Sequence, residues 1–162
     1  KTLELDLRDN GLSDDGAALI ADALAKCDRL EVLKLRLSKN DITKEGVGAV
    51  VSSLPKRLQC LELALEEIGA ADGIADWLGD LPYYARHMWR LDLQVGGKGI
   101  TDAHVAEIHR GLFHRPRLMV LRLEISASEV TDDGAEELAQ VEDRALAGWG
   151  TDVLIVILGS VV

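Results

Sequence analysis

The chain has 162 residues, enough for a single domain, and a formal net charge of −10. Hydrophobic residues make up 48% of it but aromatic residues only 4%, so its core must be aliphatic. The acidic balance argues against binding to nucleic acid or to an anionic membrane surface, because both rely on a basic stripe that neutralises phosphates.

The two cysteines, Cys27 and Cys60, are too few for a disulfide framework. We interpret them as reduced thiols of an intracellular protein, either cytoplasmic or organellar. No apolar run reaches the roughly 20 residues that a membrane helix needs, and the longest fits a strand. The chain begins at Lys1, directly within a strand pattern, so we expect the true N-terminus to be missing.

The sequence repeats itself about every 30 residues. Each unit begins with a run in which leucine or another aliphatic residue alternates with polar residues, and this period of two predicts a strand. The runs begin at Leu3, Leu33, Leu61, Leu91 and Leu121, and a weaker sixth begins at Leu154. We therefore expect residues 1–162 to form one repeat domain with a final strand near 153–158.

Each strand pattern is followed by apolar residues at helical spacing. The residues at the N-cap positions are Ser13, Thr43, Thr101 and Thr131, and acidic residues follow them, as suits the positive end of a helix dipole. A strand and a helix repeated at this period predict an α/β solenoid. We expect a right-handed superhelix with a curved parallel sheet on its concave side and helices on its convex side.

The pattern Leu-x-Leu-x-x-Asn-x-Leu/Ile-Ser/Thr-x-x-Gly resembles the leucine-rich repeat family. The unit of about 30 residues with a full helix is similar to the ribonuclease-inhibitor-like branch of that family. The asparagine of the pattern stands at Asn10 and Asn40 only, where the resemblance implies that its side chain satisfies buried backbone groups of the turn. Other residues take this position in the later repeats.

The resemblance implies binding rather than catalysis. We expect a non-enzymatic protein–protein interaction module or scaffold, a subunit or fragment of a larger assembly. The alternative is a regulator of a small GTPase, similar to the activating proteins of this branch. The sequence contains no nucleophile elbow, P-loop or dinucleotide fingerprint, and its histidines do not form a metal set, so we expect no catalytic residue, metal or cofactor.

The candidate binding residues on the concave face are the polar ones between the inward leucines. A sheet face exposed only to solvent would also be polar, so polarity alone does not decide between the two interpretations, and the family resemblance favours binding. We expect a partner with a basic patch opposite Glu62 and Asp92. The candidates are Glu4, Asp6, Lys34, Arg36, Glu62, Asp92, Gln94, Arg122 and Glu124.

Two further segments depart from the repeat pattern. Residues 77–89 carry most of the aromatics, and Tyr83, Tyr84 and Trp89 are either interface anchors or fillers of the core. The final strand is apolar on both faces, so we expect Ile155 and Ile157 to be covered by another subunit, a further segment or a cap. The predicted partners are therefore proteins, in a hetero-complex, at the concave face and the C-terminal strand, with no nucleic acid and no membrane insertion.

Overall fold

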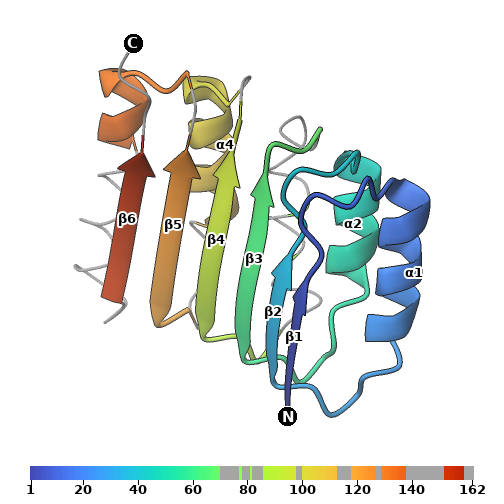
Figure 1. Cartoon of the computed structure of the whole chain (residues 1–162). Helices are drawn as coiled ribbons and strands as arrows, with labels where there is room; N and C mark the ends of the chain where they lie inside the picture. Colours follow the sequence, from blue (N-terminus) through green and yellow to red (C-terminus); the bar gives the residue numbers. More distant parts are fainter. Residues whose placement is uncertain are drawn as a thin grey trace.

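The computed structural model describes residues 1–69, 77, 81, 86–97, 100–112, 118–126, 129–137 and 152–158. Six parallel strands form one sheet in chain order, and the helices lie on one side of it (Figure 1). The predicted α/β solenoid is confirmed. The strands are β1 (Thr2–Asp6), β2 (Val32–Arg36), β3 (Cys60–Glu66), β4 (Arg90–Gly96), β5 (Val120–Ser126) and β6 (Asp152–Leu158), and the labelled helices are α1 (Asp14–Leu24), α2 (Lys44–Ser52) and α4 (Asp102–Leu112). Residues 132–137, which follow β5, are helical as well.

The core lies between the sheet and the helices. The register places the leucines of successive repeats side by side, so that Leu33 pairs with Leu3 on one strand and Leu61 on the next. These side chains are buried from β2 to β5, as are Val47, Val50 and Val51 on the facing side of α2. Each large aliphatic side chain buried in this way contributes about 1.5–3 kcal/mol.

The register of β6 corrects one prediction. Val153, rather than Leu154, pairs with Leu121, so Ile155 and Ile157 share the row of the buried Leu123 and Ile125. A sixth run that begins at Leu154 would place these two isoleucines in the outward row, and that expectation is wrong. A strand that is apolar at every position has no alternation to fix its register from sequence, and a shift of one residue exchanges its two faces.

The turn after β2 confirms the role expected for the asparagine at Asn40, whereas Asn10 is exposed and its side chain donates only to the Arg8 carbonyl. Asn40 is buried, and its Oδ1 accepts hydrogen bonds from the backbone N–H groups of Asn10 (3.1 Å) and Leu12 (3.0 Å). Its Nδ2 donates to the carbonyls of Leu7 (2.9 Å) and Leu37 (2.7 Å). One amide therefore satisfies backbone groups of two successive repeats.

The acidic residue at the start of a helix reaches the helix of the next repeat. Asp14 Oδ1 accepts from the backbone N–H of Thr43 (2.8 Å) and of Gly46 (3.1 Å), and its Oδ2 accepts from the Thr43 hydroxyl. These hydrogen bonds, led by that from the Thr43 backbone, lower the pKa of Asp14. A Cβ on Gly46 would collide with the Asp14 carboxylate, so the arrangement requires glycine there.

The same contact recurs late in the chain. Asp102 accepts from the backbone N–H (2.8 Å) and the hydroxyl (2.7 Å) of Thr131, and a Cβ on Gly134 would collide with it. We call this contact, between the first acidic residue of one helix and the first turn of the next, the inter-repeat clamp. The acidic residues that suit a helix dipole in the sequence thus bind the neighbouring repeat as well.

Candidate functional site

The face of the sheet away from the helices, which we call the open face, carries the polar residues between the leucines. Two rows of side chains cross the strands on this face. Glu4, Lys34, Glu62, Asp92 and Arg122 are register partners in the first row, and Asp6, Arg36, Ala64, Gln94 and Glu124 in the second. The structure thus brings together all nine residues that the sequence places on this face.

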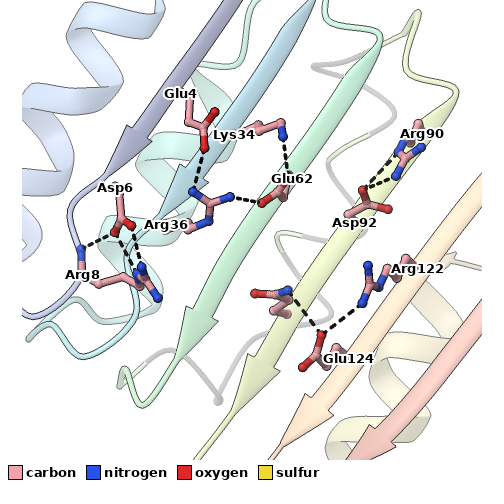
Figure 2. Close-up of polar contacts among 11 residues, drawn as sticks. Glu4, Asp6, Arg8, Lys34, Arg36, Glu62, Arg90, Asp92, Arg122 and Glu124 are labelled. Carbon is pink, nitrogen blue, oxygen red and sulfur yellow. Dashed lines mark hydrogen bonds and ion pairs between the residues drawn. The ribbon is translucent and has the colours of Figure 1, made fainter.

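Arg36 is the centre of an ion-pair cluster over β1, β2 and β3 (Figure 2). Its Nη1 donates to Glu4 Oε1 at 2.9 Å and its Nη2 to Glu62 Oε1 at 2.7 Å. Lys34 Nζ lies 3.4 Å from the other oxygen of Glu62. These two carboxylates, led by Glu4, raise the pKa of the Arg36 guanidinium. Both Nη atoms of Arg36 are therefore engaged within the chain.

A second pair occupies the end of β1. Arg8 donates from Nε (2.8 Å) and Nη2 (2.6 Å) to the two oxygens of Asp6. These hydrogen bonds lower the pKa of Asp6 to about 2. Asp6 therefore stays negatively charged through the physiological range, and it is well exposed to solvent.

On β4 and β5 the cations are exposed and the acids are not. Arg90 Nε and Nη2 donate to Asp92 Oδ2, at 3.1 and 2.8 Å, and the Arg90 side chain is 45% exposed whereas that of Asp92 is 15% exposed. Arg122 Nη2 lies 3.9 Å from Glu124 Oε2, with exposures of 49% and 20%. A molecule approaching this part of the open face therefore meets the guanidinium groups first.

Asp92 has one oxygen without a hydrogen bond. Its Oδ1 is buried, and no group in the described structure donates to it. A buried acceptor left unsatisfied costs about 1–3 kcal/mol. The open face therefore carries an energetic cost at Asp92 that a fully solvated surface would not have.

A groove of about 350 Å³ lies on the open face where β2, β3 and β4 begin. Trp89 lines it together with the charged side chains of Lys34, Glu62, Arg90 and Asp92. Its remaining lining residues are Val32, Leu33, Cys60 and Leu61. Burial raises the pKa of the Cys60 thiol, which keeps that residue neutral in the groove. The groove thus combines apolar surface with charged groups at its sides.

The aromatic segment divides between core and surface. Trp77 is buried, whereas Trp89, which lines the groove, is 37% exposed. Met119 is 57% exposed, and its backbone N–H donates to the Trp89 carbonyl at 2.8 Å. The other two interface candidates, Tyr83 and Tyr84, lie outside the described residues.

Sequence reasoning missed the residues at the beginning of the strands. Arg90 stands two positions before Asp92, and Val32 and Cys60 are its counterparts on β2 and β3. They continue the outward alternation one step before the first leucine of each run. Extending the period-two pattern in that direction would have found them.

The described part of the chain shows neither a metal cluster nor a membrane helix. Among those residues, no group of three or more His, Cys, Asp or Glu side chains could hold a metal ion. No described helix is both long enough and apolar enough to cross a membrane.

Comparison with known proteins supports the repeat assignment. Residues 1–21 and 32–51 match a family model described as Leucine Rich repeat. These two segments contain the first two strands and most of α1 and α2, together with the turns that carry Asn10 and Asn40. The chain matches none of the curated proteins with which it was compared.

Proposed function

We propose that this leucine-rich-repeat solenoid is a non-enzymatic protein-binding module whose open face contacts a partner protein. The observation that carries the proposal is the open face itself. In the described structure the helices lie on its opposite side, so the face remains uncovered while it bears a groove and fixed charges (Figure 1). Leucine-rich repeats generally mediate protein–protein interaction, and the matched segments support that class of function here.

The rigidity of the face supports binding as well. Its charged side chains stand on strands rather than on loops, and ion pairs such as Arg36–Glu62 hold them in defined positions. A partner therefore meets a surface that loses little conformational freedom on binding. We propose that the chain acts as a subunit or fragment of a hetero-complex built on this surface.

A second contact is proposed at the C-terminal strand. The register places Leu154 and Val156 in the rows of Arg122 and Glu124, so the open-face positions of β6 are apolar in sequence. Leu154 and Val156 therefore replace Ile155 and Ile157 as the residues on which a partner at that strand is proposed. Cys27 and Cys60 are both unpaired cysteines, which is consistent with an intracellular, reducing compartment.

Affinity capture from cell lysate, followed by mass spectrometry, tests the proposal. Three forms of the chain serve as baits: the unmodified protein, a charge reversal of the open face (K34E, R36E and D92K together) and a control with K39E and K44E. Lys39 and Lys44 are exposed and lie beyond the carboxyl ends of the strands, away from the groove. Circular dichroism establishes that each bait is folded.

The expected result is a set of proteins retained by the unmodified chain and the control but lost with the open-face reversal. Proteins retained equally by all three folded baits would contradict binding through this face. A GTPase-stimulation assay with the retained proteins distinguishes simple binding from the alternative, regulation of a small GTPase.

A further inference from the structure

The cations of the open face differ in how many of their donors the chain itself uses. Arg36 directs Nη1 and Nη2 to two carboxylates and is only 25% exposed. Arg90 uses Nε and Nη2 on Asp92 and leaves Nη1 without a partner among the described residues. Lys34, at 3.4 Å from Glu62, makes an ion pair and no shorter contact. The groove is therefore flanked by two cations that retain donor capacity, Lys34 on β2 and Arg90 on β4.

The acids beside these cations serve to position them. Glu62 is 22% exposed and already neutralised by Lys34 and Arg36, and Asp92 is 15% exposed and bonded to Arg90. A basic patch on a partner would have to displace these cations before reaching either carboxylate. The expectation of a basic partner opposite Glu62 and Asp92 therefore loses its support, because the accessible groups have the opposite sign.

Apolar surface adjoins the same groove. Of the three large hydrophobic side chains that are exposed in the described structure, Trp89 lines the groove just before β4, and Met119 holds the equivalent position before β5, where its backbone N–H donates to the Trp89 carbonyl. Val32 and Cys60 continue this surface along the floor of the groove, and both are half-buried. An exposed aromatic side chain that lines a groove is a feature of protein interfaces.

We propose that the open face, if it binds a protein as argued above, receives a segment in which carboxylates flank an apolar side chain. The apolar side chain enters the groove beside Trp89. The carboxylates meet Lys34 and Arg90, which are two strands apart, or on the order of 10 Å. Arg122, on the next strand, extends the row of accessible cations. The partner is thus an acidic protein segment with an apolar anchor.

A phosphate polymer fits the same face less well. The exposed carboxylates of Glu4 and Asp6 lie in the same two rows, on β1, and the whole chain has a net charge of −10. Nucleic acid and anionic membranes bind through many cations in a continuous stripe, which the open face does not present. A short peptide segment can place its carboxylates on Lys34 and Arg90 without reaching the acidic residues of β1.

Selection from a phage-displayed library of random peptides tests the proposal. The bait is the full chain, and the most enriched peptides are synthesised and their affinities measured by fluorescence anisotropy at low and high salt. We expect enrichment of Asp and Glu on both sides of one large apolar residue. We also expect weaker binding at high salt, because the charges are exposed and screened.

Three variants locate the bound peptide. Neutralisation of both flanking cations (K34Q with R90Q) should weaken binding roughly tenfold, since exposed charge pairs contribute modestly and act together here. W89A should weaken it by a similar factor through loss of the apolar wall. The control K39Q with K44Q changes the net charge equally, beyond the carboxyl ends of the strands and away from the groove, and should leave the affinity unchanged. Thermal unfolding monitors the fold of each variant.

Enrichment of basic or uncharged peptides would overturn the proposal, as would acidic peptides whose affinity ignores K34Q with R90Q. Tighter binding to phosphatidylserine vesicles or to a single-stranded oligonucleotide, lost in the same double variant, would also overturn it in favour of a phosphate surface. If no peptide is enriched while affinity capture still depends on the open face, the acidic segment is wrong and the protein-binding function stands. Failure of both experiments removes the function as well.

Discussion

Neighbouring repeats are held together by different contacts in the turn after β2 and at the end of β3. After β2, the amide of Asn40 satisfies backbone groups of its own repeat and of the one before. At the end of β3, Glu66 Oε1 accepts a hydrogen bond of 2.6 Å from the Ser126 hydroxyl at the end of β5. The strand between them contributes Gly96, whose register partners are Glu66 and Ser126. This contact therefore involves the last residues of three strands, from three different repeats.

The backbone nevertheless follows the same course in both turns. Lys39 and Glu67 stand at equivalent positions with φ of 59° and 52°, and Asp9 in the first repeat has 56°. An asparagine that serves backbone groups can be repeated in every unit and leaves a recognisable pattern. The contact between Glu66 and Ser126 leaves none, and the family match covers the first two repeats, which are the two that carry the asparagine.

The largest expected effect is the loss of the Asn40 amide. Asn40→Ala leaves two backbone N–H groups and two carbonyls without their partner in a buried turn, and should lower the free energy of unfolding by about 3 kcal/mol. Chemical denaturation measures this change in the free energy of unfolding. Asn10→Ala is the control, since Asn10 is exposed and its side chain donates only to the Arg8 carbonyl. Equal losses in the two variants would show that the amide is not what holds the turn.

The close contact of the ends of β3, β4 and β5 is tested by filling the space at Gly96. A Cβ there would collide with the backbone carbonyl and the hydroxyl of Ser126, so Gly96→Ala should destabilise the chain by about 1–3 kcal/mol. Gly48→Ala is the matched control. Gly48 lies within α2 with nothing near its Cβ position, and alanine favours helix there by up to about 1 kcal/mol. A neutral Gly96→Ala would mean that β5 moves away without cost.

The inter-repeat clamp gives an intermediate effect that depends on pH. The pKa of Asp14 is lowered in the folded chain, so its stabilisation is present above the unfolded value, near 3.8, and is lost as the pH falls through the folded value. Asp14→Asn should cost about 1 kcal/mol at neutral pH, typical of a lost helix cap. The difference from the unmodified chain should shrink below about pH 4. Asp15→Asn, at the exposed neighbouring position, is the control for the loss of one charge in the same turn.

The smallest expected effect distinguishes two arginines of the open face. Arg36→Met removes two ion pairs with Glu4 and Glu62 and should cost less than about 1 kcal/mol, because the pairs are partly exposed. Arg122→Met removes only a 3.9 Å contact with Glu124 and should change the unfolding free energy by less than about 0.5 kcal/mol. Thermal unfolding in low salt measures both. The reverse order would mean that Arg122 is structural and Arg36 is available to a partner.

The fold followed from the sequence because its signals are local. The spacing of the leucines predicted the strands, the threonines predicted the helix starts, and Asn40 predicted its turn. The register of β6 could not be predicted, since an apolar residue at every position from Val153 to Leu158 supports either face.

The candidate site followed only in part. Alternation placed Glu62, Asp92 and Arg122 on one face, but it could not show which charges remain accessible. That depends on ion pairs between repeats, such as Arg36 with Glu62, and within one strand, such as Arg90 with Asp92. Trp89 was named as an interface candidate, but the groove beside it was missed because Arg90 stands just before the pattern that defines the repeat.

The inter-repeat clamp also sets the unit in which this solenoid can be cut and rejoined. Asp14 completes the helix of the second repeat, and Asp102 does the same for the helix that follows α4. A single repeat moved into another array would leave behind the carboxylate that its first turn requires. Chimeras should therefore transfer pairs of consecutive repeats, with the junction before the helix that supplies the aspartate.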